Sequence, residues 1–199
     1  MRIPLFLALA QWALLLALGL LVVTAYRQLG RVLGRSRTPP ELGPVIGARP
    51  GPIAYQRLAG SEGGAPGGPI HMFRPGDGQP ALVAFVDPTC PTCEQLVTAL
   101  SAARRDGELD GLRVLLLTSD PPAYLQISAA FRATSLEIGR PLDRADLEPY
   151  RPSATPLLVA IDGAGVVRQA GTAARPAEVR AMSQACLLPP PGALLPVLK

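Results

Sequence analysis

The chain begins with an uninterrupted apolar run. Residues 5–23 contain no charged side chain and a single glutamine. A helix of about 20 apolar residues is long enough to cross the hydrocarbon core of a bilayer. The pattern therefore predicts a transmembrane helix within residues 1–26, which we interpret as a membrane anchor.

A cleaved signal peptide is the alternative interpretation of this segment. It would begin at Met1 and Arg2 and would end at the small residues around Ala25. Apolar regions of signal peptides extend to about 15 residues, so the run at 5–23 is too long for one. An uncleaved anchor is the favoured interpretation.

Polar, proline-rich sequence follows and predicts a linker over residues 27–51. It carries closely spaced arginines and then prolines, namely Arg27, Arg31, Arg35, Arg37, Pro39, Pro40, Pro44 and Pro50. The remainder, residues 52–199, is long enough to bury a hydrophobic core as one domain.

Within residues 52–199, apolar runs predict strands and amphipathic stretches predict helices. Residues 81–86 and 114–117 are continuous apolar runs, as in strands that are covered on both faces. The other predicted elements are short strands at 70–73 and 136–138, helices at 94–105, 122–132 and 176–187, a helical turn at 146–150, and a hairpin of 156–161 with 166–169. This order predicts an α/β domain with helices against a mostly parallel sheet that has an antiparallel edge.

The net charge of +4 is unevenly distributed. Residues 1–37 contain five arginines and no acidic residue, so residues 38–199 sum to −1. The domain therefore lacks the basic surface that nucleic-acid binding requires. The arginines beside the apolar run are placed to meet anionic lipid head groups.

Two of the three cysteines form a Cys-x-x-Cys motif between a predicted strand and a predicted helix. Cys90 and Cys93 would share one face of the helix start, where their sulfurs can close a disulfide. At the helix start, free backbone N–H groups favour a thiolate at Cys90, whereas Cys93 lies one turn inside. Cys90 is thus the expected nucleophile and Cys93 the resolving thiol. Between them, Pro91 fits the first helical turn, and Thr92 supplies a neutral hydroxyl.

Other uses of these residues have weaker support. A zinc site would need two further ligands, and only Cys186, His71 and carboxylates remain, at unsuitable spacings. Cys186 is interpreted as a buried apolar residue of the last helix rather than as a third redox partner. We therefore predict no metal and no cofactor beyond a redox-active disulfide between Cys90 and Cys93.

The motif and the residues after it resemble the thioredoxin-like redoxins. The resemblance rests on the strand–Cys-Pro-x-Cys–helix unit followed by Tyr150, Thr155, Pro156, Asp162, Gly165 and Gly171. It implies a thioredoxin-like fold, a cis bond before Pro156, and a substrate-binding role for the backbone of Thr155.

The amino-terminal part is most similar to the MauD family of methylamine-utilisation accessory proteins. The similarity rests on Trp12 within the anchor, the sequence Tyr-Arg-Gln-Leu-Gly at 26–30, and the proline-rich linker. It implies an exported, cysteine-containing protein as substrate. The disulfide-rich small subunit of methylamine dehydrogenase is the candidate that the resemblance names.

The chain departs from the thioredoxin pattern at two positions. Ala84 replaces the buried aspartate six residues before the first cysteine, and Thr89 replaces the usual tryptophan. The proton acceptor for Cys93 is therefore unassigned; Asp87 and Glu94 are nearby, and we interpret both as solvated carboxylates. Asp87 also occupies the position where a peroxidase motif requires threonine, which disfavours peroxidase chemistry.

Two considerations favour opposite orientations of the domain across the membrane. Only Arg2 precedes the apolar run and four arginines follow it, which favours a cytoplasmic domain. A tethered dithiol protein is most useful where disulfides persist, outside the cytoplasmic membrane. We predict a single-pass inner-membrane protein with its domain in the periplasm, exchanging disulfides with exported proteins. The rivals are a thiol reductant for cytochrome c or other metalloprotein assembly, and a non-catalytic thioredoxin-fold escort.

Overall fold

The structure is a computed structural model that describes residues 14–19, 43–58 and 69–187. The predicted transmembrane helix and most of the predicted linker lie outside these residues, although residues 14–19 are helical. Of the helices within the described ranges, none combines the length and the apolar character needed to cross a membrane. The chain divides into two units, Met1–Glu41 and Leu42–Lys199, and the second contains the sheet described below.

The described part of the second unit is built on a seven-stranded mixed sheet with the order β2-β1-β5-β4-β3-β6-β7. The strands are β1 (Ile53–Arg57), β2 (Ile70–Phe73), β3 (Ala81–Phe85), β4 (Arg113–Leu117), β5 (Glu137–Pro141), β6 (Leu157–Ile161) and β7 (Val167–Gly171). The three central strands β3, β4 and β5 are parallel, and every other pairing is antiparallel. The carboxyl ends of the parallel strands therefore share one edge of the sheet.

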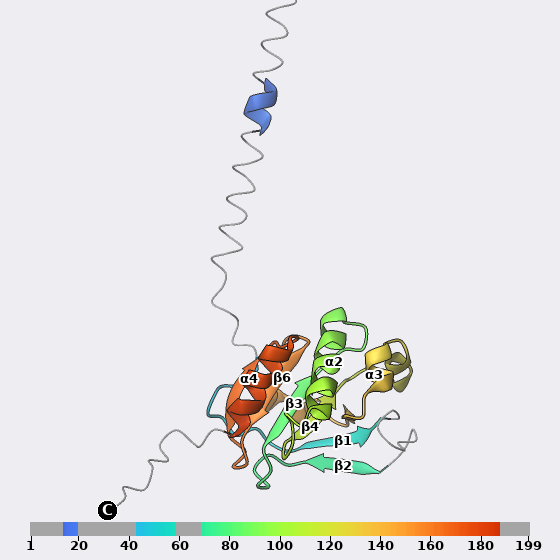
Figure 1. Cartoon of the computed structure of the whole chain (residues 1–199), viewed down its shortest axis with the longest axis vertical. Coiled ribbons are helices and arrows are strands. Elements are labelled where there is room, and N and C mark those ends of the chain that lie inside the picture. The colour runs from blue at the N-terminus through green and yellow to red at the C-terminus, as the bar shows by residue number, and fades with distance from the viewer. Residues whose placement is uncertain (1–13, 20–42, 59–68, 188–199) are drawn as a thin grey trace, which may run out of the picture. The chain divides into compact units, whose positions relative to one another are not determined.

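Side chains of β3 alternate between two hydrophobic cores, as the two-residue period of a strand requires. Leu82 and Ala84 face one core, and Ala81, Val83 and Phe85 face the other. Three helices contribute to the first core: α2 (Pro91–Arg105), α3 (Ala129–Ala133) and α4 (Pro176–Leu187). Figure 1 shows these helices side by side. The 3-10 helix η2 (Ala145–Tyr150) contributes to the second core.

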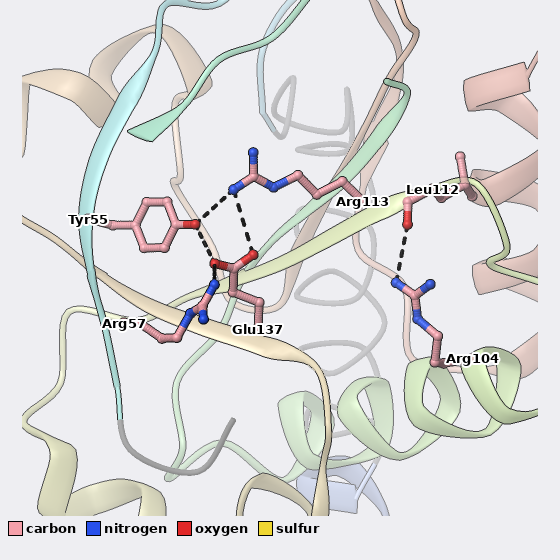
Figure 2. A network of polar contacts seen from close by, with 6 residues as sticks. All are labelled: Tyr55, Arg57, Arg104, Leu112, Arg113 and Glu137. Carbon is pink, nitrogen blue, oxygen red and sulfur yellow. Dashed lines mark hydrogen bonds and ion pairs between the residues drawn. The ribbon is translucent and has the colours of Figure 1, made fainter. Parts of the chain in front are cut away.

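A polar network joins β1 to β4 and β5 (Figure 2). The Tyr55 hydroxyl donates to Glu137 Oε1 at 2.5 Å and accepts from Arg113 at 2.8 Å. Arg57 pairs with the same carboxylate oxygen at 2.8 Å. Burial and the neighbouring Glu137 carboxylate raise the pKa of Tyr55 to about 12, although Arg113 partly opposes the rise. Although burial opposes ionisation of Glu137, the bonds from Tyr55 and the arginines hold the pKa of Glu137 below its usual value.

Two features of the fold differ from the sequence-based expectation. The strand β1 was not predicted, and with β2 it gives the sheet an antiparallel side beyond β5 as well as beyond β3. The helix predicted at 122–132 is two short pieces, η1 (Pro122–Gln126) and α3, separated at Ser128. Ser128 is buried and has an extended backbone, which interrupts the helix, and its hydroxyl donates to Glu94 on α2 at 2.9 Å.

The described end of the predicted linker packs on the sheet. Gly47 donates to the carbonyl of Val167, and Val167 donates back to Ala48. The carbonyl of Gly51 accepts from the Tyr150 hydroxyl at 2.8 Å. These bonds join residues that precede position 52 to β7 and to η2.

Candidate functional site

The Cys-x-x-Cys motif lies where the central strand β3 ends and α2 begins. Cys90 is the residue that caps the helix, with an extended backbone, and Pro91 occupies the first helical turn. Proline fits there because the first N–H groups of a helix have no partner inside it. The next residues, Thr92 and Cys93, complete that turn. The strand and the helix cap together place both sulfurs at the carboxyl edge of the parallel strands.

Cys90 has a thiol whose ionisation the helix start favours. Its side chain is partly exposed. Burial opposes the charge, but the nearby backbone N–H groups of Cys93 and Thr92 and the Cys93 thiol favour it more strongly, so the pKa of Cys90 lies below its ordinary value. A lowered pKa increases the thiolate fraction, and the thiolate is the nucleophilic form of cysteine.

Cys93 lies in the opposite environment. It has no exposed surface and belongs to the core between the sheet and the helices. Burial raises the pKa of Cys93 to about 12, and the neighbouring Cys90 adds to the effect. The backbone N–H of Asp87 donates to the Cys93 sulfur at 3.4 Å. This bond and the nearby Thr155 side chain partly oppose the rise in pKa.

The loop before β6 faces the motif. The Cys90 sulfur lies 4.0 Å from the carbonyl oxygen of Thr155. The Thr155–Pro156 peptide bond is cis, which confirms the geometry that the resemblance implied. Thr155 is exposed and Pro156 is buried. The structure thus brings Cys90, Cys93, Thr155 and Pro156 together from two segments that are 65 residues apart.

Both carboxylates near the motif have other partners. Asp87 accepts from the backbone N–H and the hydroxyl of Thr89, each at 2.7 Å. Glu94 accepts from Ser128. Ala84 is fully buried in the same core as Cys93. Among the described residues, no carboxylate is hydrogen-bonded to the Cys93 sulfur, which accepts from the backbone N–H of Asp87.

The third cysteine is remote from the motif along β3. Cys186 is buried in α4, and its thiol donates to the carbonyl of Ala81 at 3.4 Å and to that of Met182 at 3.5 Å. Burial raises the pKa of Cys186 to about 12. Ala81 begins β3 whereas Cys90 follows its end, so the strand separates the two thiols. This position matches the prediction of a buried apolar residue.

His71 also lies away from the motif. Its ring stacks on Tyr55, with ring centroids 5.7 Å apart, on strands β2 and β1. No three potential ligands among histidine, cysteine, aspartate and glutamate cluster within the described ranges.

Two contacts at the site were not found from the sequence. The bond from the Asp87 N–H to Cys93 depends on how the loop after β3 folds back. The contact of the Thr155 side chain with Cys93 depends on the distant loop before β6. The only sequence signal for either was the identification of Thr155 and Pro156 from the resemblance.

No family model matches the chain, and no curated protein matches its sequence. Solved structures match at low identity. A thiol:disulfide interchange protein of the thioredoxin family from Chlorobium tepidum is 14% identical, with a TM-score of 0.53 over 70% of this chain and 98% of that one. A secreted Mycobacterium tuberculosis disulfide oxidoreductase homologous to E. coli DsbE is 16% identical, with a TM-score of 0.52 over 67% and 95%.

A peroxiredoxin-like protein from Aquifex aeolicus is also similar, at 13% identity and a TM-score of 0.50 over 70% of this chain and 85% of that one. Proteins described by different activities thus share this architecture, and a shared fold does not fix the chemistry. At these identities the likeness concerns the backbone arrangement. The second unit of the chain therefore has a thioredoxin-like α/β fold with a mixed central sheet.

Proposed function

We propose that the chain is a protein thiol–disulfide oxidoreductase with Cys90 and Cys93 as its redox pair. One observation carries the proposal: a partly exposed thiol of lowered pKa lies beside a buried thiol of raised pKa, facing the Thr155 carbonyl. Such asymmetry suits a pair in which one sulfur exchanges with substrate and the other resolves the intermediate.

The exchange can be written with every bond and electron balanced. The Cys90 thiolate attacks one sulfur of a substrate disulfide, a Cys90–substrate disulfide forms, and the second substrate sulfur leaves as a thiolate. Cys93 then loses its proton and attacks the Cys90 sulfur, which releases the first substrate sulfur. The protein ends with a Cys90–Cys93 disulfide, and the substrate gains two electrons and takes up protons from solvent. The reverse sequence oxidises a substrate dithiol.

We place the reaction outside the cytoplasmic membrane, on exported proteins. The apolar run at 5–23 supports an anchor. Disulfides persist in the periplasm, and one structural neighbour is described as secreted. The similarity to the MauD family makes the small subunit of methylamine dehydrogenase the candidate substrate.

Trapping the intermediate tests the proposal. In a full-length Cys93→Ser variant, the resolving thiol is absent, so substrates should accumulate as disulfides with Cys90 on non-reducing gels. A Cys90→Ser, Cys93→Ser double variant is the control and should trap nothing. Cells making methylamine dehydrogenase should yield its small subunit in the trap. Equal recovery from the double variant would refute the redox role, and a trap without that subunit would refute the substrate assignment.

A further inference from the structure

A cavity of about 240 Å³ lies beside the candidate site, at the carboxyl ends of the parallel strands. Its walls come from β3, β4, β5, η2 and the loop that carries Thr155. Phe85, Leu117 and Leu147 belong to the core on the sheet face opposite α2. The cavity is therefore distinct from the surroundings of Cys93, which lies in the other core.

The size of the cavity restricts what it can hold. A cavity of ~150 Å³ in another protein binds benzene, so one of about 240 Å³ can accept an aromatic ring. Pockets for drug-sized ligands and cofactors usually measure roughly 300–1,000 Å³. The space here therefore suits one large side chain better than a whole cofactor.

The buried part of the lining is apolar except for Thr118, and the exposed part carries polar side chains. Phe85, Leu117 and Leu147 are buried and form the apolar part. At the rim, Ser119, Arg144 and Glu148 are exposed. None of these three side chains has a hydrogen-bond or ion-pair partner within the described part of the chain. A side chain with an apolar body and a polar tip matches this arrangement, and tyrosine has both.

Thr155 connects the cavity to the reactive sulfur. It lines the cavity, and its carbonyl oxygen lies 4.0 Å from the Cys90 sulfur. An extended polypeptide advances about 3.3 Å per residue. A substrate cysteine bonded to Cys90 would therefore place a residue one or two positions away at the mouth of the cavity.

We propose that this cavity is a specificity pocket for an aromatic side chain, tyrosine above all, located one or two residues from the reacting cysteine of the substrate. The proposal rests on the proposed function, because it assigns a pocket to the substrate of that exchange. The pocket selects among protein substrates according to the residues next to the reacting cysteine. The chemistry of sulfur exchange stays with Cys90 and Cys93.

Short peptides test the pocket. Each contains one cysteine, linked through a disulfide to a chromogenic aryl thiol, with alanine or tyrosine at one of the two positions on either side. Reduced full-length protein attacks the peptide sulfur through Cys90, and the aryl thiolate leaves. At one of these positions, the tyrosine peptide should have a kcat/KM roughly tenfold or more above that of the alanine peptide, because the tyrosine ring is buried in the cavity. Phenylalanine should fall between them.

Two variants assign that preference to the cavity. Ser119→Trp should fill the rim and bring the tyrosine-to-alanine ratio close to one. Ser135→Trp places the same side chain at an exposed serine that follows α3 and does not line this cavity, and it should keep the wild-type ratio. A ratio near one for the wild-type protein at every position, or an unchanged ratio in Ser119→Trp, would overturn the pocket while leaving the exchange intact. Wild-type protein no faster than Cys90→Ser with any disulfide would overturn both proposals.

Discussion

Cys90 and Cys93 are three positions apart, yet their sulfurs have opposite surroundings. Cys90 caps a helix and is partly exposed, and the nearby backbone N–H groups help to lower its pKa. Cys93 is enclosed by the core, and few polar groups compensate for its burial. The difference arises from one helical turn, which carries the chain from solvent into the interior.

The pH dependence of alkylation tests this difference. Because the pKa of Cys90 is lowered, its thiolate forms at lower pH than that of a free cysteine, which titrates near ~8.5. As pH increases, the alkylation rate of the reduced protein should therefore reach half of its plateau value at a pH below that of a free cysteine. Cys90→Ser should lose the fast phase, and Cys186→Ser should retain it. A fast phase that survives in Cys90→Ser would contradict the assignment of the nucleophile.

The placement of the two sulfurs could be predicted from sequence, but the groups around Cys93 could not. A strand, a Cys-Pro-Thr-Cys segment and an amphipathic helix define which thiol is outside and which is inside. The contact with Thr155 joins segments far apart in the chain, and no local pattern encodes it. The replacement at Ala84 indicated only that the usual buried acid is missing.

At the scale of elements, strands β1 and β5 pack closely at Gly139, whose missing side chain leaves room for the Tyr55 ring. A Cβ at this position would overlap the ring of Tyr55, which is buried on β1. Gly139→Ala should therefore lower the free energy of unfolding by about 1–3 kcal/mol, the usual cost of overpacking. Gly171 on β7 has open space where a Cβ would lie, so Gly171→Ala is the matched control. Equal effects in urea unfolding followed by circular dichroism would contradict the packing described here.

The network around Glu137 should make stability depend on pH. Its pKa is lowered in the folded protein, so its contribution is complete above the unfolded value of ~4.3 and is lost as pH falls through the folded pKa. Glu137→Gln should lower the free energy of unfolding by about 1.5–3 kcal/mol at neutral pH, since bonds to a charged group are lost. The difference from wild type should shrink toward pH 3. A difference independent of pH would show that the carboxylate charge contributes nothing.

Elements with a strong local pattern were predicted, and those defined by distant contacts were not. The runs at β3 and β4 are apolar throughout and could be identified directly. β1 has only Ile53 and Tyr55 facing the core, and its partner β5 lies more than 80 residues away. The break between η1 and α3 lies at Ser128, whose hydroxyl bonds to Glu94 of another helix, and no local pattern encodes such a contact.

For the whole molecule, orientation in the membrane is the most consequential expectation from sequence. The arginines after the apolar run favour a cytoplasmic domain, whereas disulfide exchange with exported proteins requires the opposite. We expect Cys90 of the reduced protein to react with a membrane-impermeant maleimide in intact cells with a permeable outer membrane. The Cys90→Ser variant is the control, because any labelling of it must come from the other two thiols. Labelling only after lysis would place the domain in the cytoplasm.

The most direct test of thiol–disulfide exchange follows both partners of one reaction by mass spectrometry. Reduced full-length protein is mixed with a peptide that contains an intramolecular disulfide, and the thiols are then blocked and mapped. We predict that the peptide gains two hydrogen atoms while a disulfide appears between Cys90 and Cys93, with Cys186 still a free thiol. An unchanged peptide, or a protein disulfide that includes Cys186, would contradict the proposed redox pair.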